Sequence, residues 1–246
     1  MQSYRPSSNA LPPVVKNLVI IYVIMLFATF VLEMRGISLT RILGLHYFQS
    51  ADFRPYQLVT HIFMHGGLMH LVFNMFALWM FGRVLESVWG PKRFFIYYFV
   101  TGLGAAALHS FVNFMEFQSV ASKMNIEEVQ NVMMQGADIL SQGKNYIDPL
   151  AAKLNLILNT PTVGASGAVF GILLGFGMLF PNTQLMLLFP PIPIKAKYFV
   201  MGYGAIELYL GITQSGSNIA HFAHLGGMLF GFIMIKYWNK RTNHFY

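Results

Sequence analysis

The chain has 246 residues, of which 55% are hydrophobic and 10% charged, and its formal net charge is +7. This composition is too apolar for a soluble globular protein and predicts an all-α, polytopic membrane protein. The basic residues flank apolar segments, where they act as topology signals, so the positive charge does not indicate nucleic-acid binding. Cysteine is absent, which excludes a disulfide framework and a thiolate nucleophile.

A membrane-spanning helix needs about 20 mainly apolar residues, and the chain contains six such segments. They cover residues 17–34, 57–82, 93–114, 162–181, 198–214 and 217–238. The pattern predicts an N-terminal segment over 1–16, a six-helix membrane domain over 17–238 and a C-terminal tail over 239–246.

The connections differ in character. Residues 35–56 mix polar and aromatic side chains, which favours a structured loop at the membrane interface. Residues 115–161 are rich in Gln, Asn, Glu, Lys and Asp, and we expect them to form an aqueous-side insertion with two amphipathic helical patches. Residues 181–197 contain several prolines, which predict a tight turn.

Charge predicts the orientation. With six spans both termini lie on one side, and the loops of that side carry ten basic residues and one acidic residue. The loops of the other side carry six basic and seven acidic residues. The positive-inside rule therefore predicts cytoplasmic termini, with Ser166 and His224 in the outward half of the bilayer and the insertion outside the cytoplasm.

Small residues recur at helical spacing around Ser166 and again around His224. They are Gly164, Ala168, Gly171 and Gly175 in the first stretch and Ala220, Gly227 and Gly231 in the second. Such faces allow helices to approach closely, so the serine and the histidine can come within hydrogen-bond reach.

The second span carries His61, His65, His70 and Asn74, an unusual number of polar groups for a membrane helix. His70 and Asn74 are one turn apart and share a face. They could form an oxyanion clamp, or they could make interhelical hydrogen bonds that serve packing; spacing alone favours neither.

Ser166 alone is weak support for a nucleophile, because most serines in small-residue helices serve packing. The two histidines of the sixth span could be proton-relay groups, metal ligands or a general base. Helical geometry separates them, since His224 lies roughly 40° from the small-residue face and His221 roughly 100°. His224 is therefore the better candidate to reach Ser166.

Four motifs occur together in this chain. They are His65-x4-His70-x3-Asn74, Glu86-x3-Gly90-x3-Phe94, Gly164-x-Ser166-Gly167 and Ala223-His224-x2-Gly227-x3-Gly231. In type, order and spacing they resemble the rhomboid family of intramembrane serine proteases, and the resemblance covers most of residues 57–238.

The resemblance implies Ser166 as the nucleophile and His224 as its base. His70, Asn74 and the backbone N–H of Ser166 would form the oxyanion site. Supporting residues would be Phe170, which packs on the catalytic imidazole, together with His65, Gly164 and Gly167.

The implied activity is hydrolysis of peptide bonds in or near the membrane segments of single-pass proteins, within the lipid bilayer of a bacterial plasma (inner) membrane, without metal or cofactor. Of nine carboxylates only Glu207 lies well inside a span, and no matched motif uses it. We therefore predict a Ser–His dyad. The short fifth span contains Gly202, Gly204 and Gly211, so we expect a movable wall through which substrate enters.

Two non-enzymatic alternatives remain, a rhomboid-like pseudoprotease and a small transporter. A pseudoprotease is expected to have lost the serine or the histidine, and a transporter to show related halves. The His-Glu-x-x-His motif of a metalloprotease is absent.

Overall fold

The structure is a computed structural model that describes residues 11–186, 191–213 and 220–241. It is 75% helical, which confirms the predicted all-α class, and a short antiparallel hairpin of β1 (Gln184–Met186) and β2 (Pro193–Lys195) occupies the predicted turn. The helices are α1 (Pro13–Glu33), α2 (Leu39–Leu43), α3 (Gln57–Thr60), η1 (His61–Phe63), α4 (Leu68–Ala77), η2 (Leu78–Gly82), α5 (Arg83–Trp89), α6 (Pro91–Ala121), α7 (Ile126–Ser141), α8 (Pro149–Asn159), α9 (Ser166–Leu179), α10 (Ala196–Thr213) and α11 (His221–Arg241).

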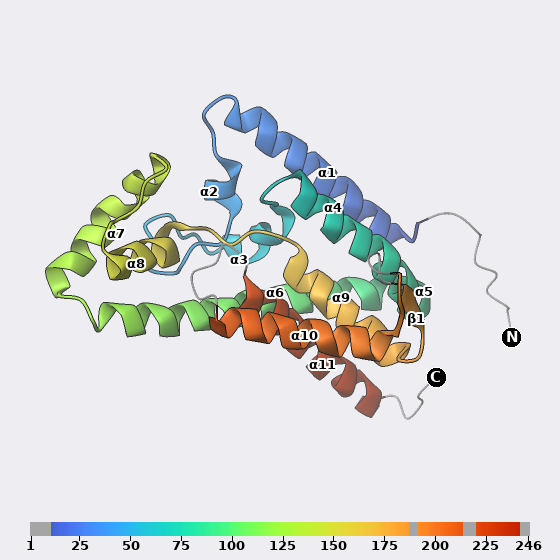
Figure 1. Ribbon diagram of the computed structural model, residues 1–246. Coiled ribbons are helices and arrows are strands. Elements are labelled where there is room, and N and C mark those ends of the chain that lie inside the picture. Colours follow the sequence, from blue (N-terminus) through green and yellow to red (C-terminus); the bar gives the residue numbers. More distant parts are fainter. Residues whose placement is uncertain (1–10, 187–190, 214–219, 242–246) are drawn as a thin grey trace, which may run out of the picture.

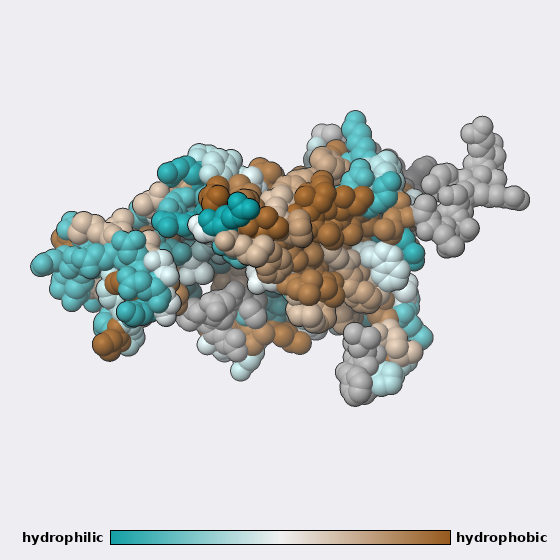
Figure 2. Space-filling model, turned by 90° about the horizontal axis from the view of Figure 1, so that it is seen from above, coloured by the Kyte–Doolittle hydropathy of each residue, from teal (hydrophilic) through white to brown (hydrophobic). Residues whose placement is uncertain are grey.

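Three helical segments among the described residues are long and apolar enough to cross a membrane. They are α1, the continuous run from α4 through η2 to α5 (Leu68–Trp89), and α6. The helix α9 is equally apolar but has only 14 residues. On the face seen from above, hydrophobic residues cover the middle, and hydrophilic residues gather at the end formed by α7 and α8 (Figure 2).

The second predicted span begins later than residue 57. Residues 57–67 form α3, η1 and a turn, and the membrane-length helix starts at Leu68 and continues to Trp89. Gly67 ends the turn with a φ of +144°, a conformation that side-chain-bearing residues rarely adopt. His61 and His65 therefore lie before the helix, whereas His70 and Asn74 lie within it.

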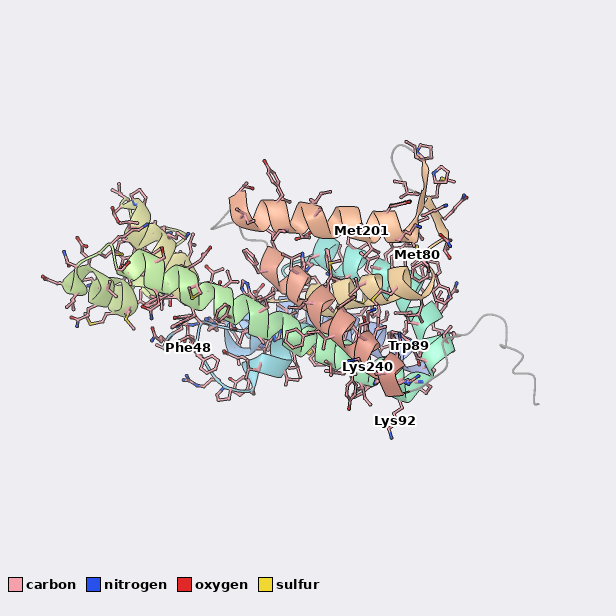
Figure 3. The ribbon with its side chains drawn as sticks, turned by 90° about the horizontal axis from the view of Figure 1, so that it is seen from below. Phe48, Met80, Trp89, Lys92, Met201 and Lys240 are labelled. Atoms are coloured by element: carbon pink, nitrogen blue, oxygen red, sulfur yellow. The ribbon has the colours of Figure 1, made fainter. Side chains whose placement is uncertain are left out.

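The centre of the bundle is formed by α6, α9 and α11, whose mutual contacts are the most extensive in the described chain. In Figure 3, α11 crosses α6 and α10 lies at the edge of the bundle. A methyl group at Gly227 would overlap the backbone carbonyl of Gly167, and one at Gly171 would overlap Thr101. Gly227, a member of the second predicted small-residue face, thus lets the backbones of α9 and α11 touch, whereas Gly171 of the first predicted face lies against α6.

Glu86 joins α1 to the bundle. Its two carboxylate oxygens accept hydrogen bonds from the backbone N–H groups of Val14 (2.9 Å) and Val15 (2.8 Å) at the start of α1. Glu86 falls in the connection between the second and third predicted spans, yet its side chain is buried. Because the first N–H groups of a helix lack intrahelical acceptors, a carboxylate is a suitable partner there.

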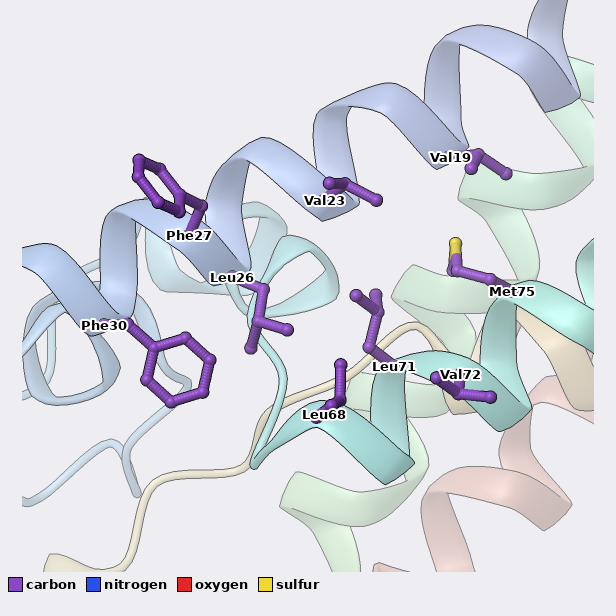
Figure 4. Close-up of a pocket in the computed structure, with 9 residues that line it drawn as sticks. All are labelled: Val19, Val23, Leu26, Phe27, Phe30, Leu68, Leu71, Val72 and Met75. Carbon is purple, nitrogen blue, oxygen red and sulfur yellow. The ribbon is translucent and has the colours of Figure 1, made fainter.

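Farther along, α1 and α4 leave an open apolar groove of about 390 Å³ between them (Figure 4). Its lining is entirely aliphatic, aromatic or thioether, and includes Val23, Leu26, Phe30, Leu68 and Met75. The groove does not include Ser166 or His224, so it is separate from the candidate site.

The polar insertion folds as predicted into two helices, α7 and α8, and α6 extends into its predicted start as far as Ala121. The helices pack together around a small apolar cluster, which also takes Tyr47 from the loop after α2. The members of this cluster are Tyr47, Phe117, Val120, Val132, Ala151, Leu154 and Leu158. The insertion therefore has its own core beyond the end of the bundle (Figure 1).

Candidate active site

Ser166 is the first residue of α9, and the segment before it is tied down at two points. Thr162 exchanges two backbone hydrogen bonds with Leu45, at 2.8 and 2.9 Å. The N–H of Gly164 donates to the carbonyl of His61 at 3.0 Å. Because the first N–H groups of a helix have no intrahelical acceptor, the N–H of Ser166 lies at the electropositive end of α9.

Gly164 meets two separate requirements of this turn. Its φ of +125° is rarely adopted by residues with a side chain, and an added methyl group would meet the imidazole ring of His70. The Gly164 backbone and the His70 ring are therefore in close proximity. This places His70 next to the turn that carries Ser166.

His224 lies one turn into α11 and faces Ser166. Its Nε2 is 2.9 Å from the Ser166 Oγ, although the residues are 58 positions apart in sequence. Gly167 follows Ser166 on α9, and its contact with Gly227 of α11 sets the two helix backbones at the separation that this hydrogen bond requires.

Phe170, to which the family resemblance assigned a supporting role, packs on the imidazole of His224. The rings of Phe170 and His224 are 4.1 Å apart and 4° from parallel. Phe170 also stacks on Tyr203 of α10, with ring centroids 5.0 Å apart. His224 is thus held on one ring face by a column of two aromatic side chains.

Glu207 of α10 completes the surroundings of the imidazole. Its Oε2 is 2.9 Å from the Nδ1 of His224 and 2.7 Å from the Nδ1 of His221, and all three side chains are buried. The predicted absence of an acidic partner is therefore wrong. The available signal was that Glu207 is the one carboxylate well inside a predicted span, a feature that by default points to function.

The remaining predicted residues lie nearby in different arrangements. Asn74 is buried and its Nδ2 donates to the carbonyl of His70 at 2.8 Å, while the Nδ1 of His70 accepts from the N–H of Gly66 at 3.3 Å. His65 is buried with its ring 5.1 Å from that of His70. The Asn74 and His70 side chains share one region, but Asn74 uses one of its donors within its own helix.

A small cavity of about 10 Å³ adjoins Ser166. Polar groups of His61, Thr162 and Ser166 line part of its wall, and the volume is close to that of a single water probe. From the sequence, Gln214 and Asn218 are further candidates to line a water path together with the histidines of the second span, but both lie outside the described residues.

Glu207, His221 and His224 also form a group that could hold a metal ion, because their ligand atoms lie within 4.8 Å of one another. The sequence analysis predicted no metal. The geometry fits a hydrogen-bonded network as well, since one carboxylate oxygen accepts from both Nδ1 atoms and the remaining nitrogen of His224 faces Ser166.

The described chain is thus a helical bundle with three segments of membrane-spanning length, in which a serine and a histidine are in hydrogen-bond contact where two helices pack closely. A family model described as Rhomboid domain matches residues 52–241. The chain belongs to the rhomboid family.

The chain is similar to RHOMBOID-like protein 12, mitochondrial, of Arabidopsis thaliana, with 29% identity over 71% of this chain and 44% of the relative. It is also similar to Rhomboid protein 1, mitochondrial, of Saccharomyces cerevisiae, with 26% identity over 72% of this chain and 40% of the relative. Rhomboid protease GluP of Bacillus subtilis is 27% identical over 72% of this chain and 25% of its own length. The chain thus spans less than half the length of these curated relatives.

These relatives correct the predicted location. The sequence analysis assigned the chain to a bacterial plasma membrane with cytoplasmic termini, whereas several of the relatives, including those from A. thaliana and S. cerevisiae, are mitochondrial proteins. The prediction of a bacterial plasma membrane is wrong, and the cytoplasm and exterior of a bacterium therefore do not name the two sides of this membrane.

Proposed function

We propose that the protein is an intramembrane serine endopeptidase in which Ser166 is the nucleophile and His224 its general base. The observation that carries this proposal is the 2.9 Å contact between Ser166 Oγ and His224 Nε2. A nucleophile and a base within hydrogen-bond reach, with the base oriented by other groups, is the general signature of covalent acyl transfer.

The reaction follows from these positions. Ser166 Oγ attacks a peptide carbonyl carbon while its proton passes to His224 Nε2. The negative charge that develops on the carbonyl oxygen is stabilised by the N–H of Ser166 with His70 and Asn74. His224 returns the proton to the leaving amine, and water from the adjoining cavity then hydrolyses the acyl-enzyme.

The membrane arrangement that goes with this function has six spans: α1, the run from α4 to α5, α6, α9, α10 and α11. A 14-residue helix such as α9 is about 21 Å long, which is shorter than the roughly 30 Å hydrocarbon core. If the C-terminal end of α9 lies at one membrane surface, Ser166 at its N-terminal end lies below the opposite surface. The substrates would be single-pass proteins whose membrane segments enter from the bilayer.

The mitochondrial relatives support a location in a mitochondrial membrane, for which the inner membrane is our proposal. Because the chain matches less than half of each of these relatives, we extend only the location of the shared rhomboid region. Fractionation of tagged protein with mitochondrial inner-membrane markers tests this assignment.

The activity is tested with purified protein in detergent, using a fluorophosphonate probe that phosphonylates activated serines and fluorescent casein as a peptide-bond substrate. We expect the wild type to be labelled at Ser166 and to cleave casein, and Ser166→Ala to lose both properties with an unchanged melting temperature. Ser87→Ala is the matched control, because Ser87 is exposed and its hydroxyl bonds only to its own helix at Arg83. A folded wild type that is neither labelled nor active would favour the pseudoprotease alternative.

A further inference from the structure

The carboxylate of Glu207 is shared between the two histidines of α11. Its Oε2 accepts from the Nδ1 of His224 at 2.9 Å and from the Nδ1 of His221 at 2.7 Å. Exposed fractions are 5% for Glu207, 9% for His224 and 4% for His221. A carboxylate buried to this degree is costly unless it is hydrogen-bonded, so the two imidazoles are the partners that make its position tolerable.

This arrangement determines where the imidazole protons lie. An ionised carboxylate only accepts hydrogen bonds, so both Nδ1 atoms must carry hydrogen. A neutral His224 protonated on Nδ1 presents a free lone pair on Nε2, which is the atom 2.9 Å from Ser166 Oγ. The Glu207 bond thus selects the one neutral tautomer of His224 that can accept the serine proton.

A second residue of α10 supports the same imidazole. Tyr203 lies one helical turn before Glu207 and stacks on Phe170, which in turn stacks on His224. The helix α10 therefore reaches the His224 ring both at its Nδ1 edge and, through Phe170, at its face.

We propose that Glu207 is a positioning residue that fixes the tautomer and orientation of His224, and that His224 is ready to act as a base only while α10 is docked against α11. The proposal rests on the proposed function of Ser166 and His224. It replaces the predicted dyad by an acid–base–nucleophile series in which the acid stands on a different helix from the base.

The first test uses Glu207→Gln and Glu207→Met, with Glu116→Gln as the matched control because Glu116 is a partly exposed carboxylate paired with Lys153. We expect fluorophosphonate labelling and kcat on casein to fall by between about 10-fold and 10⁴-fold, the upper figure being the loss seen when the triad carboxylate of a serine protease becomes an amide. KM should stay within twofold of the wild-type value, and the melting temperature within a few degrees of it. Glu207→Asp should recover part of the lost rate. Wild-type labelling in either folded Glu207→Gln or Glu207→Met would overturn the proposal.

Nitrogen NMR of selectively labelled His224 in the unmodified protein provides a measurement that needs no variant. We expect hydrogen on Nδ1, with a far-downfield proton resonance typical of a bond to a carboxylate. Hydrogen on Nε2 would overturn the proposal even if every variant failed to fold. If wild-type Ser166 is not labelled at all, the proposed function fails, whereas this NMR result still decides whether Glu207 sets the tautomer.

The docking of α10 is tested by introducing a bulky side chain at Gly211 or at Gly202, two positions on different faces of α10. A side chain at Gly211 would press on Phe222 and His221, whereas Gly202 has open space around it. We expect Gly211→Leu to reduce labelling at least tenfold and Gly202→Leu to leave it unchanged. Faster labelling in Gly211→Leu would show that α10 restrains the site, and it would overturn the docking requirement.

The same group of ligands could instead hold a metal ion. If a chelator abolished wild-type labelling and added zinc restored it, the cluster would be a metal site and the positioning role would be overturned. We expect labelling to be insensitive to chelators.

Discussion

The ring of Phe170 lies 4.1 Å from the imidazole of His224 and within 4° of parallel to it. Phe170 stands one turn after Ser166 on α9, so a single short helix supplies both the nucleophile and one wall of the base. The imidazole is therefore fixed on its face by α9 and at its Nδ1 edge by Glu207 of α10.

The stack predicts a moderate effect of Phe170→Leu on rate. An aromatic pair contributes about 0.5–1.5 kcal/mol beyond its buried area, which corresponds to a loss of roughly twofold to tenfold in fluorophosphonate labelling and in kcat. Phe176→Leu is the control, since Phe176 lies on the same helix and packs edge-to-face against Phe81, with ring centroids 4.9 Å apart. We expect Phe176→Leu to lower the melting temperature without slowing labelling. If Phe170→Leu lowered only the melting temperature and left labelling at the wild-type rate, Phe170 would have no supporting role at the imidazole.

Substitution of Asn74 is expected to lower kcat more than substitution of Phe170 does, with little effect on KM. If it stabilises the oxyanion, Asn74→Ala should lower kcat by about 10²–10³ and change KM little. In the structure its Nδ2 donates to the His70 carbonyl at 2.8 Å, so the second hydrogen of the amide is the one available to substrate. Asn159→Ala in α8 is the control. A rise in KM at constant kcat would instead assign Asn74 to substrate positioning.

Much of this site follows from local sequence. The small residues around Ser166 and His224 predicted a close contact between two helices. Gly227 does meet the backbone of α9, but at Gly167, which lies outside the predicted stripe, and Gly171 of that stripe faces Thr101 of α6. The angular argument selected His224 over His221, and His224 is the histidine that contacts Ser166. These features follow from helical periodicity, which a single sequence displays.

The features that were missed depend on tertiary structure. Glu207 is 17 residues from His224 on a separate helix, and no short motif links the two. Similarly, hydropathy alone extended the second span back to residue 57, because Ile62 and Met64 are apolar, although they are buried beside a turn rather than in a membrane-length helix. The predicted location was wrong because a bacterial membrane was assumed, whereas several of the relatives are mitochondrial proteins.

The contact between α9 and α11 predicts that Gly227→Ala is destabilising. A methyl group there would overlap the Gly167 carbonyl, so the helices must separate, at a cost of about 1–3 kcal/mol for overpacking. We expect a lower melting temperature and slower labelling of Ser166, because separation lengthens the contact to His224. Gly202→Ala introduces the same methyl group into open space on a helix, where Ala is favoured over Gly, and should lower neither value. Equal stability of the two variants would contradict the close packing.

The last prediction concerns the attachment of α1 by Glu86. The two carboxylate oxygens accept from Val14 N–H at 2.9 Å and Val15 N–H at 2.8 Å, more than 70 residues away in sequence, and the side chain is 2% exposed. Removing the carboxylate leaves buried N–H groups without an acceptor, which costs about 1–3 kcal/mol for each group. Glu86→Ala should therefore lower the melting temperature strongly, and Glu86→Gln should do so less, because its amide retains one acceptor oxygen.

Glu128→Gln is the matched control for this change. Glu128 also accepts from a backbone N–H, that of Asn125 at 3.1 Å, but it does so on the exposed surface of the insertion. We expect its melting temperature to stay close to that of the wild type, since water can replace a lost partner there. Below their melting temperatures, all three variants should label Ser166 at the wild-type rate, because Glu86 acts on α1 and not on α9 or α11. Slower labelling of folded Glu86→Gln would show instead that the position of α1 is transmitted to the active site.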